Sequence, residues 1–266
     1  MSTPSLPSST TPLAPPERLI ILGMRADCID MPGALDYIEM LIEQRRQSPG
    51  PVQRIMTANT EFIWEARKNP PFLEAINTCQ LVTADGMGIV WASRILKHPF
   101  PERITGVDLL PELAGRCAAR GYRLFLLGAA PGVAEAAAKI LQQRAPGLQI
   151  AGVYAGSPAP EEAEHILGLI RAARPDVLAL AYGTPRQELW IYKYAQELGE
   201  AGVCLAVGVG GAFDFITGRV PRAPLWMRRA GLEWVFRLMR QPRRAWRMRV
   251  LFPIGAMVWV QRFRGK

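Results

Sequence analysis

The sequence predicts an α/β protein with a mostly parallel sheet, helices on both faces of the sheet, and a basic amphipathic helical appendage at the C-terminus. Three observations lead to this prediction. Short apolar runs alternate with longer helical patterns along most of the chain. Several of the runs are apolar at consecutive positions, as in strands that are covered on both faces. Positive charge is concentrated near the C-terminus.

Three segments divide the chain. Residues 1–17 are rich in Ser, Thr and Pro, which is typical of a disordered leader. We expect residues 18–218 to form the α/β catalytic domain and residues 219–266 to form the appendage. The expected strands are seven apolar runs, at residues 19–23, 54–58, 80–84, 122–128, 148–154, 176–183 and 203–210.

Helical patterns lie between these runs. The segment 131–145 begins with proline and is rich in helix formers, and 159–173 has acids near its start and an arginine near its end. The segment 184–199 opens with Thr-Pro and closes at glycine. Because strands alternate with helices, the sheet should be parallel, and ligands should collect at the carboxyl ends of its strands.

The charge and amino-acid composition limit the classes of function that fit this chain. The tail from Arg219 onward holds thirteen Lys and Arg and one acid, a net charge of +12, which leaves −3 for the rest of a chain with total charge +9. Such a tail suggests an anionic partner, for which phosphates, nucleic acid and a lipid surface are the candidates. Two histidines and four dispersed cysteines argue against a zinc cluster or a His-based triad. No apolar stretch reaches the ~20 residues of a membrane span.

The segment TANTE places two polar side chains after an expected strand. If residues 57–59 are extended, Thr57 and Asn59 point the same way, and their neutral groups suit a sugar or a ribose. Helix capping by Asn59 or Thr60, with Glu61 in the first turn, explains the same residues. The residues alone leave both interpretations open.

The segment LVTADGMGIV contains one carboxylate, Asp85, in apolar surroundings. Asp-Gly between apolar runs is typical of a hairpin turn. The residues that follow favour a helix, however, so we expect a strand, a turn and then a helix, with Asp85 at the carboxyl edge of the sheet. Asp85 could serve there in catalysis or only as the N-cap of the helix.

Other polar or glycine-rich segments follow strands. GAAPG, at residues 128–132, resembles a phosphate-binding loop, although a tight turn explains it more simply. Gln187 and Glu188 fall in the first turn of a helix, where Gln187 could contact a ligand and Glu188 could complement the helix dipole. Asp214 could be catalytic or could pair with an arginine.

The basic end combines arginine with aromatic residues. Arg237, Arg240, Arg244 and Arg247 would share one face of a continuous helix, although Pro242 interrupts the pattern. Guanidinium groups suit diphosphate oxygens, and the mixture with aromatic side chains is typical of a segment lying on anionic lipid. Nucleic acid is disfavoured because the tail is too apolar and no recognition motif is present.

Seven segments in this order resemble the WecG/TagA/CpsF glycosyltransferases. The resemblance covers roughly residues 19–249 and rests on TANTEF, ADGMGIVWASR, RITGVDLLPEL, LLGAAPGVAEAAA, GTPRQELW, GVGGAFDFITGRVPRAPLWMRRAGLEWVFRL and QPRRAWR.

The resemblance implies a Rossmann-like enzyme at the cytoplasmic face of the bacterial plasma membrane. Such an enzyme moves a sugar from a UDP-sugar to a polyprenyl-diphosphate-linked acceptor, with inversion and with no metal or other cofactor. N-acetylmannosamine and its uronic acid are the favoured sugars, and a UDP-glucose-dependent exopolysaccharide glucosyltransferase is the alternative.

The resemblance also implies roles for particular residues. Asp85 matches the general base, and Thr57, Asn59 and Gln187 match positions that line the substrate pocket. The arginines that bind the donor diphosphate correspond to Arg237, Arg244 and Arg247.

Other possibilities stay open on the sequence alone. One is an inactive nucleotide-binding or membrane scaffold protein. A homo-oligomer is another, because a basic, apolar tail can be buried in a subunit contact as well as in lipid.

Overall fold

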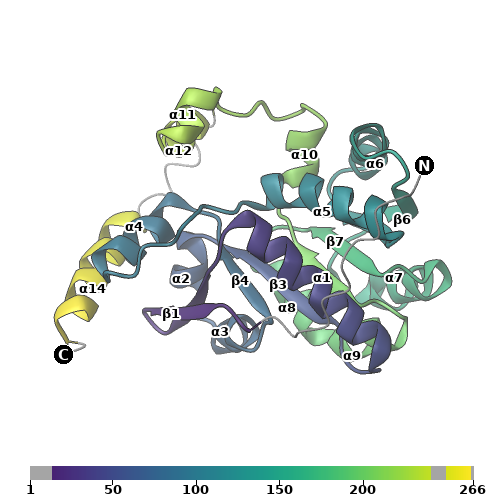
Figure 1. The fold of residues 1–266 in the computed structure, drawn as a ribbon, viewed down its shortest axis with the longest axis horizontal. Coiled ribbons are helices and arrows are strands. Elements are labelled where there is room, and N and C mark those ends of the chain that lie inside the picture. The colour runs from purple at the N-terminus through teal and green to yellow at the C-terminus, as the bar shows by residue number, and fades with distance from the viewer. Residues whose placement is uncertain (1–13, 241–249, 265–266) are drawn as a thin grey trace, which may run out of the picture.

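The expected α/β fold is confirmed by a computed structural model, which describes residues 14–240 and 250–264. A parallel sheet with strand order β4-β3-β8-β7-β5-β6 is flanked by helices (Figure 1). The strands are β1 (Glu17–Ile21), β2 (Met24–Cys28), β3 (Gln53–Ala58), β4 (Leu81–Ala84), β5 (Arg123–Gly128), β6 (Gln149–Tyr154), β7 (Val177–Ala181) and β8 (Leu205–Gly208).

The helices connect successive strands and continue beyond the last strand. They are α1 (Met31–Gln47), α2 (Thr60–Ala66), α3 (Pro70–Asn77), α4 (Met87–Ile95), α5 (Gly106–Arg120), α6 (Val133–Arg144), α7 (Pro160–Ala173), α8 (Arg186–Lys193), α9 (Ala195–Glu200), α10 (Ala212–Ile216), α11 (Leu225–Arg229), α12 (Glu233–Arg240) and α14 (Leu251–Arg264).

The centre of the sheet explains why its strands are apolar at consecutive positions. β8 pairs in parallel with β3 on one side and with β7 on the other. Every residue of β8, and every residue of β7 except the half-buried Ala181, is buried. Helices therefore cover both faces, as the uninterrupted apolar runs predict.

The first apolar run lies outside the main sheet. β1 pairs antiparallel with β2 in a separate two-stranded sheet, and the two strands are joined through Leu22 and Gly23, both at positive φ. β2 was not predicted from the sequence, because Arg25 and Asp27 interrupt its apolar pattern. Both charged side chains are nevertheless buried.

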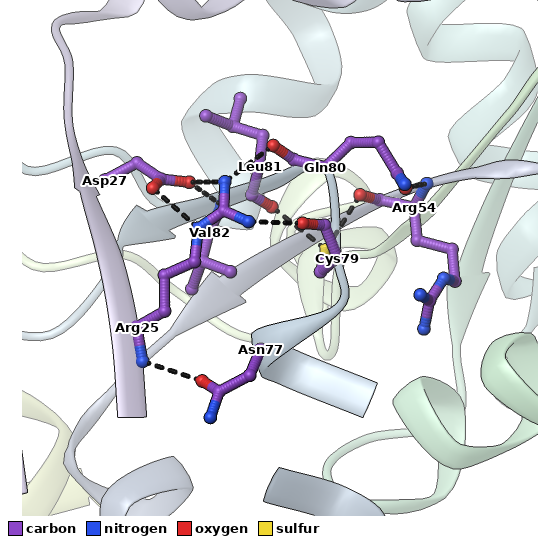
Figure 2. A network of polar contacts seen from close by, with 8 residues as sticks. All are labelled: Arg25, Asp27, Arg54, Asn77, Cys79, Gln80, Leu81 and Val82. Atoms are coloured by element: carbon purple, nitrogen blue, oxygen red, sulfur yellow. Dashed lines mark hydrogen bonds and ion pairs between the residues drawn. The ribbon is translucent and has the colours of Figure 1, made fainter. Parts of the chain in front are cut away.

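Arg25 and Asp27 connect this hairpin to the edge of the main sheet (Figure 2). The Arg25 guanidinium donates to both carboxylate oxygens of Asp27, at 2.8 Å each, and also to the Cys79 and Gln80 carbonyls. The Val82 N–H of the edge strand β4 donates to Asp27 Oδ2 at 2.8 Å. The buried pair thus satisfies polar groups that an open sheet edge would expose.

The helical patterns of the sequence correspond to α4, α6, α7 and an α8–α9 pair. Residues 184–199 were expected to form one helix, but Tyr194 separates α8 from α9 because its backbone (φ −104°, ψ 23°) leaves the α-helical region. The GAAPG segment forms a tight turn from β5 into α6, in which Gly128, Ala129 and Gly132 have positive φ.

The C-terminal helix α14 lies beside α4 at one end of the molecule (Figure 1). Its Ile254 and Val258 are buried in the same apolar cluster as residues of α2 and α4. The Gln261 side chain accepts from the Leu22 N–H and donates to the Ile20 carbonyl, each at 2.8 Å. No helix in the described part of the chain is long and apolar enough to cross a membrane.

Candidate functional site

Asp85 lies in the turn between β4 and α4, at the carboxyl edge of the parallel sheet. The segment is therefore a strand, a turn and a helix, and not a hairpin. The Asp85 N–H donates to the Ala58 carbonyl at 2.8 Å, which fixes the turn against the end of β3. Gly86 occupies the N-cap position of α4, so helix capping does not account for Asp85.

Two glycines allow the start of α4 to pack closely against the start of α2. A Cβ atom on Gly86 would lie 3.0 Å from the Asn59 Cβ, and one on Gly88 would collide with the Thr60 side chain. Larger residues at either position would push the two helices apart. The glycines thus bring Asp85 and Asn59 to the same pocket.

Asn59 is the N-cap of α2. Its Oδ1 atom accepts a hydrogen bond from the Glu61 N–H at 2.8 Å, so the capping interpretation is confirmed. Asn59 also lines the pocket beside Asp85. The cap holds the side chain at the pocket wall, and its role toward substrate stays a prediction.

The pocket beside Asp85 has a volume of about 190 Å³. One wall is formed by the starts of α2 and α4, and the other by α12 and the start of α14. Segments far apart in the sequence therefore complete a single cavity. The polar and aromatic residues that line it include Asn59, Asp85, Trp91, Arg103, Glu233 and Trp234.

Arg103 is a pocket residue that our sequence reasoning missed. Its Nη1 donates to the Asp85 carbonyl at 3.2 Å, and its Nη2 donates to Glu233 Oε2 at 3.1 Å. The guanidinium thus connects the Asp85 turn to the first residue of α12. The RITGVDLLPEL segment of the resemblance begins with Arg103, and this was the signal that could have identified it.

Glu233 ties α12 to the body through a second arginine. Its Oε1 lies 3.5 Å from Arg222 Nε, and both side chains are largely buried. Arg222 also makes two hydrogen bonds to the Asp108 carboxylate. Burial raises the pKa of Asp108, but the bonds from Arg222 and Thr105 outweigh it and bring that pKa below its ordinary value. The bonds from Arg222 thus favour the charged form of Asp108, and the network holds α12 over the pocket.

Thr57 and Gln187 are buried and are not among the residues that line the pocket. The Thr57 hydroxyl donates to the Gly208 carbonyl at 3.3 Å. Gln187 Oε1 accepts from the backbone N–H groups of Gly183 and Gly210 at 3.0 and 3.1 Å. Both side chains are buried, and they support the ends of β3, β7 and β8. Their contact with substrate stays a prediction.

Glu188 belongs to the same buried group. Its Oε1 accepts from Gln187 Nε2 at 2.6 Å, whereas its Oε2 has no hydrogen-bond partner in the described residues. Burial raises the pKa of Glu188 to about 7, although the Gln187 bond acts in the opposite direction. Glu188 was expected to complement the helix dipole, but its carboxyl group is fully buried and not at the surface.

The arginines expected to bind the donor diphosphate are only partly covered by the structure. Arg237 lies in α12, which forms part of the pocket wall, but its side chain is outside what the structure describes. Arg244 and Arg247 lie outside the described residues. Their roles stay predictions. Within residues 14–240 and 250–264, no three His, Cys, Asp or Glu side chains are grouped as metal ligands.

Comparison with known proteins agrees with the resemblance. Residues 19–266 match the glycosyl transferase WecG/TagA/CpsF family. Three similar proteins share the name N-acetylglucosaminyldiphosphoundecaprenol N-acetyl-beta-D-mannosaminyltransferase. The protein from Bacillus spizizenii is 35% identical over 75% of both chains. The Bacillus subtilis protein is 31% identical over 80% of both chains, and that of Staphylococcus aureus strain MW2 is 34% identical over 73% of this chain and 75% of its own.

The match covers nearly the whole chain, including α11, α12 and α14. The chain belongs to the WecG/TagA/CpsF family of glycosyltransferases.

Proposed function

We propose that this WecG/TagA/CpsF glycosyltransferase transfers N-acetylmannosamine, or its uronic acid, from a UDP-sugar to a polyprenyl-diphosphate-linked saccharide during cell-surface polysaccharide synthesis. The names of its relatives support N-acetylmannosamine as the sugar and a polyprenyl-diphosphate-linked N-acetylglucosamine as the acceptor. The observation that carries the proposal is the pocket in which Asp85 and Arg103 lie under α12. This pocket combines a carboxylate, a guanidinium group and a wall from the basic C-terminal region.

In the proposed reaction Asp85 is the general base. The acceptor hydroxyl has a high pKa, so a carboxylate must take its proton as the oxygen attacks the anomeric carbon. The bond from that carbon to the UDP oxygen breaks, and its electron pair leaves with UDP. Attack from the face opposite UDP inverts the anomeric configuration.

The leaving diphosphate develops negative charge, which guanidinium groups can offset without a metal ion. Arg103 lines the pocket, and Arg237 lies on the helix that forms one of its walls. Arg244 and Arg247 would add charge from the segment between α12 and α14. In this proposal, an arginine-rich segment near the membrane does the work for which many transferases use a divalent cation.

The proposal includes peripheral association with the cytoplasmic face of the plasma membrane, and exposed apolar side chains support binding to a lipid surface. Among the described residues, ten large apolar side chains are exposed, and eight of them belong to the segment from residue 225 onward. Apolar and aromatic side chains beside arginines favour binding at the surface of anionic lipid. The eight are Leu225, Trp226, Leu232, Met239, Phe252, Trp259, Val260 and Phe263.

A donor panel tests this proposal. The purified protein is given UDP-N-acetylmannosamine, its uronic acid, UDP-glucose or UDP-N-acetylglucosamine, each with a short polyprenyl-diphosphate-N-acetylglucosamine acceptor. We expect a disaccharide product with the mannosamine donors, formed in the presence of EDTA and with inverted configuration by NMR. Transfer only from UDP-glucose, loss of activity in EDTA, or no transfer from any donor would contradict the proposal.

A further inference from the structure

A second cavity continues from the Asp85 pocket and has a different chemical character. It has a volume of about 570 Å³ and lies between α4, α12 and α14. No charged side chain lines it among the described residues. Six residues line both cavities, so the polar and the apolar space share a wall: Thr60, Gly88, Trp91, Trp234, Leu238 and Leu251.

We propose that this cavity, here named the α4–α14 groove, binds the part of the acceptor's polyprenyl chain that adjoins the diphosphate. The inference rests on the proposed function and assigns a subsite within it. In a polyprenyl diphosphate the hydrocarbon chain begins directly at the phosphate oxygen. When the acceptor's sugar hydroxyl is at Asp85, the sugar ring and the diphosphate separate it from the first isoprenoid carbon, so the chain must begin at the border of the polar pocket.

The groove offers the chain an apolar exit. Beyond the shared wall, Ala92, Ile95 and Ile254 contribute aliphatic surface. Burial of isoprenoid carbon against such surface is favourable roughly in proportion to the area removed from water. Affinity for a diphosphate should therefore increase with the length of its attached isoprenoid until the groove is filled.

The groove also leads toward the surface that we propose lies on the membrane. Phe252 lines the groove and is 86% exposed, and Trp91 lines both cavities and is 41% exposed. Trp259 and Phe263 stack on the same helix, with ring centroids 5.9 Å apart. A polyprenyl chain could thus pass from the groove into the bilayer without crossing open water.

Gly255 provides a way to fill the groove. It lines the groove on α14, and a Cβ atom at this position would meet no other atom within 4 Å. Because Gly255 lines the groove and the space at its Cβ position is open, we expect a leucine side chain there to narrow the cavity without displacing the described backbone. Ala256, next on the same helix, is exposed and does not line the groove, so Ala256→Leu is the matched control.

The test measures binding of farnesyl diphosphate and isopentenyl diphosphate by titration calorimetry, without donor, below the concentration at which either ligand forms micelles. We expect the wild-type protein and Ala256→Leu to bind farnesyl diphosphate at least about ten-fold more tightly than they bind isopentenyl diphosphate. Gly255→Leu should reduce this preference to about two-fold or less, with isopentenyl diphosphate binding unchanged.

A second pair of variants covers the case in which Gly255→Leu does not fold. Phe252→Glu places a charge at the rim of the groove, and Phe263→Glu places one at an exposed site on the same helix outside it. Only Phe252→Glu should reduce the preference for the longer chain.

Three results would overturn the proposal. The first is a wild-type protein that binds the two diphosphates equally well. The second is an equal loss of affinity for both diphosphates in a Gly255→Leu protein that is folded. The third is a preference for the longer chain that Gly255→Leu and Phe252→Glu both leave intact. The last would assign the groove to another occupant, such as residues 241–249 or a second copy of the chain. Because no sugar transfer is measured, these outcomes are independent of the donor panel.

Discussion

Two polar groups lie at the same edge of the sheet, and only one of them lines the Asp85 pocket. After β3 and β4, Asn59 and Asp85 line the pocket. After β7, Gln187 and Glu188 are buried around Gly208 and Gly210. In the sequence the two groups look alike, because each follows an apolar run and precedes a helix. Such a sequence pattern therefore predicts that a polar residue lies at the edge of the sheet, but it does not predict whether that residue can contact a ligand.

The difference comes from what packs on each group. A Cβ atom on Gly208 would lie 2.6 Å from Gln187 Nε2, so the space above β8 is already filled by α8 side chains. At Asp85 the corresponding space is bounded by α12 and α14, which the chain supplies more than a hundred residues later. Arg103 and Glu233 hold that distant wall in place.

The largest effect is expected for Asp85→Asn. Asparagine keeps the size of the side chain but cannot take a proton, so turnover should fall by about 10²–10⁴-fold while donor affinity changes little. Steady-state kinetics with both substrates, together with thermal unfolding as a control, measure this. Unchanged turnover would leave Asp85 as a turn residue only.

Glu188→Gln should act on stability and not on turnover. Because burial raises the folded pKa of Glu188 from 4.5 to about 7, the protonated form is favoured by folding. This stabilisation is complete below pH 4.5 and is lost as the pH rises through about 7. Glutamine stays neutral, so over that range the wild type should lose up to about 3 kcal/mol of unfolding free energy relative to the variant.

Urea unfolding of both proteins at a series of pH values measures this difference. If the unfolding free energies of the two proteins change with pH in the same way, the carboxyl group is not buried as described. A large loss of turnover in Glu188→Gln at neutral pH would show that the buried group acts on the substrate, and the contrast between the two groups would fail.

The smallest effect is expected for Asn59→Ser, which separates the capping of α2 by Asn59 from its proposed contact with substrate. Serine caps helices as well as asparagine does, so Asn59→Ser should keep the start of α2 and change the unfolding free energy by less than about 0.5 kcal/mol. Loss of the amide should raise KM for the donor by about ten-fold if Asn59 contacts substrate, a difference of about 1.4 kcal/mol. Asn69 caps α3 through the Phe72 N–H at 3.2 Å and does not line the pocket, so Asn69→Ser is the control. Equal kinetics in both variants would reduce Asn59 to a cap.

Much of the fold could be predicted because its cause is local. All seven apolar runs form strands, and the turn chemistry around Asp85 predicts a strand, a turn and a helix. Two features differ from what the local pattern indicates. Strand β2 carries charges that are satisfied only by the neighbouring edge of the sheet, and residues 184–199 form two helices because the backbone leaves the helical region at Tyr194.

The sequence by itself determined the parallel α/β class, the family and the position of Asp85 at the carboxyl edge, since these depend on periodicity and motif order along the chain. Only the tertiary structure decided which polar residues share a cavity. Arg103, Glu233 and Trp234 share the pocket with Asp85 because segments far apart in sequence pack together, whereas Gln187 is buried against Gly208 and Gly210. Contacts of that kind depend on how helices cover the sheet edge, and no local pattern encodes them.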